Sequence, residues 1–460
     1  MAPRTASPRR LSALVLLAAA ALAMAPAAAS GRAVEGPDPL IPSSGSDAYD
    51  VERYDVRLSY RPRTDLLAGT VRIEGRARRE LRELPLDLYG LRVVGATLNA
   101  APAGVARGRN KLRLQPARAL GAGEPFTAVV RYRGRPRLIR AADGGLEGWA
   151  HTPDGALAMG QPIGTATWLP CNNTPADKAR FEFRITVPQR LKAVANGRLV
   201  GVERRNGLAT YHWRASEPMA PYVALVNIGR GKLRRWSVAG VPAWTLVQPD
   251  MWEASRRVLE TLPEVIRFLS RSFGPYPFDA AGSVVQRAPF GYALETQTRP
   301  AYAYVLDVTT MVHETAHQWF GDSVGIGRWT DIWLNEGLAT WSQWWYAEHH
   351  GGRPARQTFR RLYRVPASNK RFWEPPPGRL RSRKDLFSRA TYVRGAMTVE
   401  ALRMRIGTRA LLRTLRRWTA ARRYGFGTIP EFIELAERVS GKQLDDLFRR
   451  WLYRRGKPPL

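Results

Sequence analysis

Two histidines four residues apart, with a glutamate between them, constrain this chain more than any other feature of its sequence. His313 and His317 enclose Glu314 in the run His-Glu-Thr-Ala-His. Residues four apart lie on one face of a helix, so both imidazoles can point at the same place. The 460-residue chain has only six histidines, so this pairing around a glutamate is rarely a matter of chance. The spacing predicts a helix that carries two metal ligands.

A third ligand is available in the sequence Trp-Leu-Asn-Glu-Gly, where the glutamate is Glu336. Gly321 is suited to end the first helix, and Thr330 or Asp331 is suited to begin a second one. If the second helix folds back against the first, it would bring Glu336 to the two histidines. A glutamate between large apolar residues is costly unless it is paired or bound to a metal. Two imidazoles and one carboxylate form a typical catalytic zinc site. We therefore predict one zinc ion per chain with three protein ligands: His313, His317 and Glu336.

Glu314 lies beside the first of these ligands, where it can take a proton from a zinc-bound water. We predict that it is the general base of a hydrolytic reaction. The alternative is an ordinary helix that happens to carry this pattern, with Glu336 as a solvated side chain.

Four ordered motifs of the chain resemble the gluzincin aminopeptidases, the family that includes aminopeptidase N and leukotriene hydrolase. His-Glu-Thr-Ala-His-Gln-Trp-Phe-Gly-Asp with Trp-Leu-Asn-Glu-Gly looks like the zinc motif of that family. Residues 292–296, Tyr-Ala-Leu-Glu-Thr, look like a divergent copy of its Gly-Ala-Met-Glu-Asn loop. Residues 392–395 resemble its Tyr-x-Lys-Gly motif, and residues 168–171 its Phe-Pro-Cys segment. The resemblance runs from about Asp50 to the C-terminus.

The resemblance implies roles for four further residues. Glu295 would hold the ammonium group of a peptide's N-terminus, and Tyr392 would donate its hydroxyl to the oxyanion of the tetrahedral intermediate. Gln161 and Ala293 fall where the family contacts its substrate. The alternatives are a surface-loop glutamate for Glu295 and a core tyrosine for Tyr392.

These features together predict a zinc-dependent aminopeptidase that releases N-terminal residues from peptides with a free amine. A zinc endopeptidase of the same fold would lack the amine anchor. A non-catalytic binding protein would lack a ligand, the base or the oxyanion donor. The motifs favour the aminopeptidase because each of these groups is present.

The first residues read as a signal peptide. Arg4, Arg9 and Arg10 precede an apolar run from Leu11 to Met24 and three alanines before Ser30. We predict a signal peptide over residues 1–29 and a secreted, extracytoplasmic bacterial protein. An uncleaved N-terminal anchor is the alternative, and no other segment has the length of a membrane span. Cys171, the only cysteine, cannot form an intramolecular disulfide and is expected to be a buried apolar side chain.

The formal net charge is +33, and arginine greatly outnumbers lysine. Such a charge favours weak association with anionic envelope surfaces. The arginines are dispersed, however, and no nucleic-acid-binding motif is recognised, so no specific nucleic-acid partner is expected.

Apolar residues alternate with polar ones in several segments before residue 231, for example at residues 54–60, 126–132 and 181–187, which predicts half-buried strands. Helical patterns follow residue 244. The resemblance implies an α+β fold in which a saddle-like antiparallel β-sandwich precedes a thermolysin-like, mainly helical catalytic domain. We predict a flexible leader over residues 30–46, the β domain over 47–235 and the catalytic domain over 236–460.

The C-terminal half carries further local signals. Pro263 is expected to split or kink a helix over residues 251–273, and Thr428 to cap one that ends near Gly441. Another helix is expected over residues 443–455. Because the chain ends at Leu460, we expect an open cleft without a roofing helical domain, or a lid formed by residues 353–384.

Overall fold

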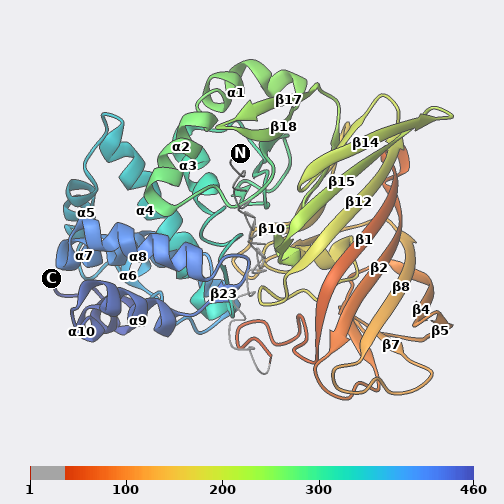
Figure 1. Ribbon diagram of the computed structural model, residues 1–460, viewed down its shortest axis with the longest axis horizontal. Helices are drawn as coiled ribbons and strands as arrows, with labels where there is room; N and C mark the ends of the chain where they lie inside the picture. Colours follow the sequence, from red (N-terminus) through yellow and green to blue (C-terminus); the bar gives the residue numbers. More distant parts are fainter. Residues whose placement is uncertain (2–36) are drawn as a thin grey trace.

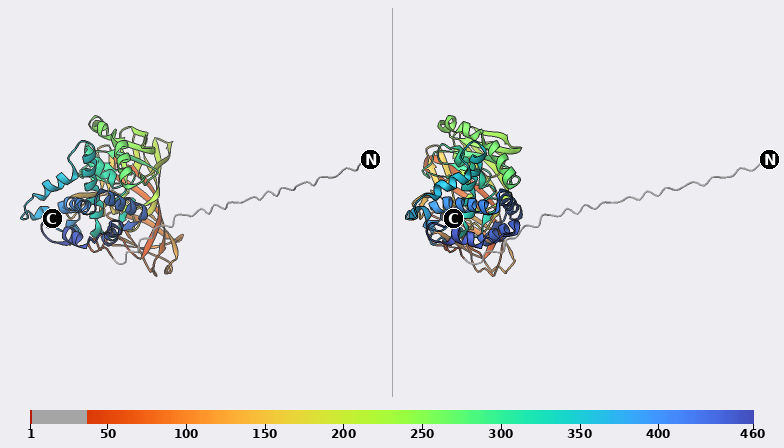
Figure 2. Two further views of the ribbon diagram at one scale, coloured as in Figure 1. Left: turned by 60° about the vertical axis from the view of Figure 1, so that its left-hand side comes forward. Right: turned by 90° about the vertical axis from the view of Figure 1, so that its left-hand side faces the viewer.

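The computed structural model describes Met1 and residues 37–460. Strands make up the right-hand half of the molecule in Figure 1, and helices make up the left-hand half, where the C-terminus lies. In the right-hand view of Figure 2 the helices lie in front of the strands. The predicted α+β arrangement, a strand domain followed by a mainly helical one, is confirmed. The predicted signal peptide lies outside the described residues.

The main sheet of the N-terminal domain has eight strands in the order β14-β15-β12-β1-β2-β8-β4-β5. Its long central strands have the alternating burial that the sequence predicts: Tyr54, Val56 and Leu58 point into the core, while Arg57 and Ser59 face solvent. The strands in sheet order are Arg198–Arg205, Leu208–Met219, Ala179–Pro188, Tyr49–Arg61, Leu66–Ala77, Pro125–Gly134, Arg92–Leu98 and Ala101–Pro102.

The sheet is not wholly antiparallel, as the sequence analysis expected it to be. β1 and β12 at its centre run parallel, with Tyr54 opposite Phe181 and Leu58 opposite Ile185. Alternating burial sets which side chains face the core, but it carries no information on strand direction. The long stretch of chain between β1 and β12 permits the crossover that a parallel pair requires.

Two smaller sheets complete this domain. A five-stranded sheet has the order β13-β16-β11-β10-β9, and a three-stranded sheet the order β3-β7-β6. The strands of the first are Lys192–Ala195, Val226–Gly229, Gly155–Met159, Leu146–Thr152 and Leu138–Arg140. Those of the second are Leu84–Asp87, Lys111–Gln115 and Gly104–Arg107. The five-stranded sheet matters for function because Leu146, the first residue of β10, and Gln161, two residues after β11, line the catalytic cleft described below.

The helical domain contains its own five-stranded sheet, in the order β17-β18-β19-β21-β20. The strands are Leu233–Val238, Val241–Val247, Ala281–Val285, Ala301–Tyr302 and Ala293–Leu294. The expected boundary between residues 235 and 236 therefore lies inside β17. A two-stranded pair, β22 (Gly325–Ile326) with β23 (Phe426–Gly427), joins two distant parts of the same domain.

The helices pack around the pair α3 and α4. No helix among the described residues is long and apolar enough to cross a membrane. Their bounds are α1 Trp252–Leu259, α2 Leu262–Phe273, α3 Val308–Ala316, α4 Trp333–His349, α5 Ala355–Tyr363, α6 Lys370–Trp373, α7 Gly395–Ile406, α8 Thr408–Ala421, α9 Ile429–Ser440 and α10 Asp445–Phe448.

Several local expectations are confirmed. Pro263 lies in the first turn of α2 and separates it from α1. Thr428 and Glu431 form the capping box of α9, and Gly441 ends that helix with a positive φ of 66°. Cys171 is fully buried.

Other local expectations differ from the structure. α3 ends at Ala316, before Gly321, because the chain turns through several backbone hydrogen bonds directly after His317. α4 begins at Trp333, preceded by a short 3-10 turn over Trp329–Asp331. The expected helix over residues 443–455 is α10 followed by a π-helical turn, Arg449–Tyr453.

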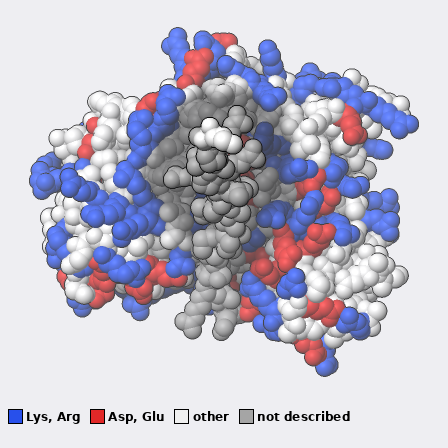
Figure 3. All heavy atoms as spheres, in the orientation of Figure 1, with Lys and Arg blue, Asp and Glu red and all other residues white. Residues whose placement is uncertain are grey.

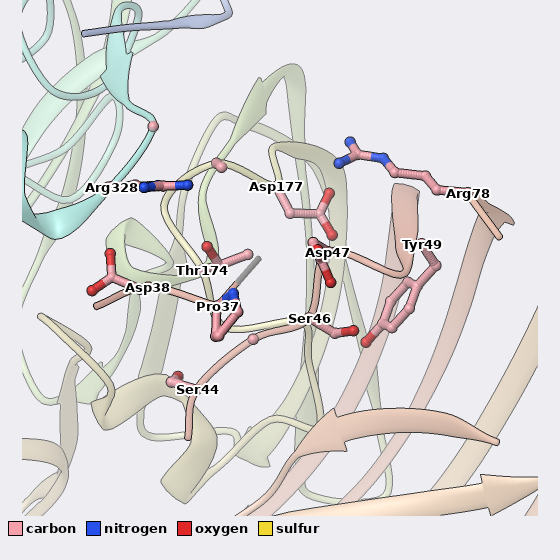
Figure 4. Close-up of a pocket in the computed structure, with 13 residues that line it drawn as sticks. Pro37, Asp38, Ser44, Ser46, Asp47, Tyr49, Arg78, Thr174, Asp177 and Arg328 are labelled. Atoms are coloured by element: carbon pink, nitrogen blue, oxygen red, sulfur yellow. The ribbon is translucent and has the colours of Figure 1, made fainter. Parts of the chain in front are cut away.

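Residues 37–46, the described part of the predicted leader, make hydrogen bonds to both domains. Asp38 is buried and accepts hydrogen bonds from the backbone N–H groups of Leu40 and of Trp329 in the catalytic domain. Figure 4 shows this segment around a small cavity of about 200 Å3 between the two domains, with Asp177 on one side and Arg328 on the other. Pro, Gly and Ser content predicted flexibility, but hydrogen bonds to distant backbone groups fix the segment in place.

Candidate active site

α3 presents the two histidines of the sequence motif. Asp307 caps the helix by accepting a hydrogen bond from the N–H of Thr310 at 3.0 Å. His313 lies in the last turn, and the N–H of His317 still bonds to the carbonyl of His313 at 3.2 Å. Gly321 has a φ of +136°, and a Cβ there would lie 3.3 Å from Nδ1 of His317. The glycine therefore lets the chain turn tightly against the second histidine.

α4 brings Glu336 to these histidines, and a close helix contact brings Tyr392 to the same place. Gly337 of α4 packs on Gly395 of α7, so closely that a Cβ on Gly337 would lie 2.9 Å from the backbone of Gly395. Tyr392 stands just before α7, in a π-helical turn over Ala390–Arg394. Both motif glycines thus permit the backbone approach that places Tyr392 beside Glu336.

The three predicted ligands converge on one point. Nε2 of His313 and Nε2 of His317 are 3.0 Å apart, and Oε2 of Glu336 lies 3.3 Å and 3.4 Å from them. Ligand atoms around a tetrahedral zinc ion, at zinc–ligand distances of about 2.0–2.2 Å, would be separated by about 3.3 Å. The spacing of the three atoms therefore matches a tetrahedral zinc site.

The hydrogen bonds of His317 support the same interpretation. Its Nδ1 lies 2.9 Å from the carbonyl oxygen of Phe320, which requires the proton on Nδ1 and leaves a lone pair on Nε2. Nε2 lies 3.4 Å from Oε2 of Glu336, in a site where all three ligand residues are at most 9% exposed. Two electron-rich atoms so close together in a buried site call for a cation between them.

A second set of possible ligands overlaps the first, because Glu295, Glu314 and His317 also have ligand atoms within 4.8 Å of one another. Zinc at a catalytic site prefers imidazole nitrogens with one carboxylate. The first set offers two imidazoles, and it leaves Glu295 and Glu314 free for other roles. Burial, with the charges of Glu295 and Glu336, raises the pKa of Glu314 well above its ordinary value.

Glu295 stands on the loop after β20, and this loop is closely fixed. Thr296, which replaces the usual asparagine of the resembling motif, donates from its hydroxyl to the carbonyl of Arg299 at 2.6 Å. Gln318, next to the second histidine, accepts the N–H of Thr298 at 2.7 Å. Burial raises the pKa of Glu295 to about 7. The hydrogen bond between Thr298 and Gln318 thereby joins this loop to the residue that follows the second histidine.

Gln161 reaches Glu295 from the other domain. Its Nε2 donates to Oε1 of Glu295 at 2.7 Å, although 134 residues separate the two in sequence. Ala293 is partly exposed in β20 and lines the same cleft. All the residues singled out in the sequence therefore meet in one cleft of about 510 Å3, where Tyr392 stacks on His313 with ring centroids 5.9 Å apart.

Sequence reasoning missed two cations that join the two domains. Lys178, in the β domain, donates from Nζ to the carbonyls of Asp322, Ser323 and Gly425, in the turn after the zinc helix and beside β23. Arg299 donates to the carbonyls of Trp244, Gly197 and Ala195. Their partners are backbone oxygens far away in the sequence, so no residue pattern points to them.

An ion pair across the cleft was also missed. Arg383 of the helical domain bonds to Glu147 of β10, which is fully buried. The other oxygen of Glu147 accepts the N–H of Ile163 at 2.8 Å, two residues after Gln161. Glu147 thus links the segment before Tyr392 to the loop that carries Gln161.

Two protein-family profiles match the chain. The profile described as the Peptidase M1 N-terminal domain matches residues 50–223, and the Peptidase family M1 domain matches residues 292–451. The leucyl aminopeptidase of Saccharolobus solfataricus is 26% identical over 310 residues, which are 63% of this chain and 38% of that protein. Human endoplasmic reticulum aminopeptidase 1 is 28% identical over 240 residues, which are 47% of this chain and 25% of that protein. The matched part of the chain thus spans less than half the length of each of these two relatives.

Solved structures match over nearly the whole chain. The M1 zinc metallopeptidase from Deinococcus radiodurans is 29% identical, with a TM-score of 0.85 over 92% of this chain and 98% of that one. A mutant of that enzyme has been solved with a Tyr-Ser-Ala substrate, and it gives a TM-score of 0.84. Because the two profiles cover more than half of the sequence and the site holds the zinc ligand set, the chain belongs to peptidase family M1, the zinc metallopeptidases.

Proposed function

We propose that this protein is a zinc-dependent aminopeptidase that removes the N-terminal residue of peptides. The observation that carries the proposal is the position of the Glu295–Gln161 pair in the same cleft as the three zinc ligands. A carboxylate beside a catalytic metal binds the ammonium group of a free N-terminus, and this fixes the scissile bond one residue away. The aminopeptidase names of the relatives support the same activity.

The groups in the cleft have separate roles in the proposed reaction. Bound zinc supplies a Lewis acid that activates water and polarises the peptide carbonyl. Glu314 is placed to take the proton of the attacking water and to pass it to the leaving amine. Tyr392 keeps its proton because burial raises its pKa well above the ordinary value, so its hydroxyl can donate to the oxyanion.

Two measurements on the purified protein test this proposal. Metal analysis should find one zinc ion per chain, and an unblocked peptide panel should release free amino acids in a zinc-dependent reaction. The same peptides with an acetylated N-terminus should be poor substrates. Equal hydrolysis of acetylated and free peptides would instead indicate an endopeptidase, and zinc binding without any hydrolysis would indicate a binding protein.

We also propose that the protein is exported through its N-terminal segment. The proposal rests on the arginines, the apolar run and the alanines of residues 1–29. Expression in a bacterial host with N-terminal sequencing of the extracytoplasmic product tests it. A product that begins near Ser30 is expected, and a full-length protein retained in the cytoplasm would contradict export.

We propose in addition that the positive charge produces weak adhesion to anionic envelope surfaces. Figure 3 shows Lys and Arg side chains over both halves of the visible face, with fewer acidic groups between them. Such adhesion should weaken steeply as salt is added. Sedimentation with anionic and neutral vesicles at two salt concentrations tests this, and equal binding to both vesicle types would contradict it.

A further inference from the structure

A second cavity opens beside the catalytic cleft. It has a volume of about 880 Å3, and it adjoins the catalytic cleft, because Asp143 and Phe387 line both hollows. Its outer wall comes from the helical domain between α5 and Tyr392. Three cationic side chains line it: Arg371, Lys384 and Arg389.

These three cations have no acidic partner among the described residues. Neither a hydrogen bond nor an ion pair joins Arg371 or Lys384 to another described side chain, and Arg389 lies over the ring of Phe372 at 5.3 Å. All three are exposed to solvent. Like charges that line one hollow repel each other, and a bound anion would relieve that repulsion.

The segment that carries them is strongly basic. Residues 353–389 contain twelve Lys and Arg but only two acidic residues, Glu374 and Asp385. Glu374 accepts the N–H of Gly456 at 2.6 Å. Asp385 accepts the N–H groups of Arg381 and Ser382 at 2.9 and 3.0 Å. Glu374 also lines the cavity, but its carboxylate is paired with Arg455 at 3.7 Å, and Asp385 does not line the cavity.

The cavity wall is held in place by interactions within the described structure. Arg383, next to Lys384, bonds to the buried Glu147 of the β domain. Ser382 and Asp385 form a capping box around the same short turn. Asn369 caps α6, which carries Arg371, by accepting the N–H of Phe372 at 3.1 Å. The cations thus project from ordered turns on either side of the hollow.

Asp143 is the acidic side chain at the junction of the two hollows. It is exposed, and it accepts the N–H of Gly145 at 3.0 Å in the turn between β9 and β10. Its charge lies toward the catalytic cleft, because it lines both hollows, whereas Arg371, Lys384 and Arg389 line only the second. An anionic group would therefore be drawn past the junction into the second cavity.

We propose that Arg371, Lys384 and Arg389 form a subsite for a carboxylate group of the peptide bound in the catalytic cleft. The proposal rests on the aminopeptidase activity proposed above and adds a substrate preference to it. The carboxylate has two sources in a peptide, an acidic side chain and the free C-terminus. Peptides that bear one within reach of the cavity are hydrolysed faster than neutral peptides of the same length.

The test compares kcat/KM for matched peptides that have a free N-terminus. One pair differs by Glu or Gln at the first residue, a second pair by Glu or Gln at the third, and a third pair by a free or amidated C-terminus. In at least one pair, we expect kcat/KM for the member with the carboxylate to be higher by about three- to tenfold, which is the effect of a few exposed ion pairs. This ratio should decrease as salt is added. The pair that shows it identifies the source of the carboxylate.

A variant and a matched control assign the preference to the cavity. The triple variant Arg371→Gln, Lys384→Gln, Arg389→Gln should lose the preference, so that the ratio of rates within the pair approaches one. The control Arg353→Gln, Arg356→Gln, Arg360→Gln removes the same charge from exposed residues on and just before α5 and should retain the ratio.

Two results would overturn the proposal: equal kcat/KM within all three pairs, or an equal loss of the ratio in the control. Failure of the underlying activity is distinguishable, because it would abolish the hydrolysis of neutral and acidic peptides alike.

Discussion

Gln161 of the β domain donates a hydrogen bond to Glu295 of the catalytic domain at 2.7 Å, in the cleft that the zinc ligands also line. The pair joins two domains at the point where the N-terminus of a substrate would bind. It also leaves Oε2 of Glu295 available for an ammonium group. Because Glu295 is 2% exposed, its position depends on the docking of both domains.

Replacement of Glu295 by Gln should reduce the selectivity for free amines. The variant keeps the size of the side chain but removes the negative charge that attracts an ammonium group. The kcat/KM for an unblocked peptide should fall toward the value for its acetylated counterpart, measured on both enzymes. If the ratio of the two values is the same as in the native protein, another group selects the amine.

Replacement of Glu314 by Gln should separate metal binding from catalysis. The zinc ligands stay intact, so metal analysis should find full occupancy, while peptide hydrolysis should fall by about 10²–10⁴-fold with the loss of the base. His313→Ala should lose zinc as well as activity. Near-normal turnover in zinc-loaded Glu314→Gln would contradict this role of Glu314.

Replacement of Tyr392 by Phe should affect the transition state more than the bound substrate. Loss of one oxyanion donor lowers kcat by about 10²–10³-fold and leaves KM nearly unchanged. Tyr346→Phe, at a half-buried tyrosine of α4 outside the cleft, is a matched control. An effect confined to KM would show that Tyr392 contacts the substrate without stabilising the oxyanion.

Replacement of Lys178 by Met should loosen the turn after the zinc helix. The change removes the Nζ donor from the carbonyls of the buried residues Asp322 and Ser323, which costs roughly 1–3 kcal/mol for each carbonyl not satisfied otherwise. The carbonyl of Gly425 still accepts the N–H of Gly325. Both the melting temperature and the affinity for zinc should fall. Lys232→Met, at an exposed lysine, should change neither. An unchanged zinc affinity in Lys178→Met would show that this contact does not support the metal site.

Asp177, beside the cavity of Figure 4, should make stability depend on pH. Burial raises its pKa from the ordinary value of 3.8 to about 7, with a further contribution from the charge of Asp50. The folded chain then binds more protons than the unfolded chain between about pH 4 and 7, so this carboxyl makes stability fall as the pH rises.

Asp177→Asn removes that dependence. The changed hydrogen bond to Asn172 shifts the melting temperature of the variant by a similar amount at every pH, so the readout is the slope. The melting temperature of the variant, measured relative to the native protein, should increase from pH 4.5 to 7.5. Parallel melting curves for the two proteins across this range would contradict the raised pKa.

The site residues that the sequence predicted line one cleft, because their positions follow from local spacing or from motifs. His313, Glu314 and His317 share one helix, and Glu336 lies on the next, so helical spacing and a single turn bring the ligands together. Glu295, Gln161 and Tyr392 were identified only through resemblance to a family. Their meeting in one cleft depends on domain docking and on the contact between Gly337 and Gly395.

The sequence predicted less of what holds the domains together. Lys178 and Arg299 bond to backbone carbonyls, which every residue possesses, so no side-chain pattern marks their partners. The parallel pairing of β1 with β12 escaped notice because alternating burial is the same for either strand direction. The order in residues 37–46 arises from hydrogen bonds of Asp38 to distant backbone groups.

A time course of one unblocked peptide of about ten residues, followed by mass spectrometry with the zinc-loaded protein, tests the central claim most directly. The account predicts a ladder of products, each shorter than the last by one N-terminal residue, and no ladder from the acetylated peptide or after removal of zinc. Internal fragments from the acetylated peptide at a comparable rate would contradict it.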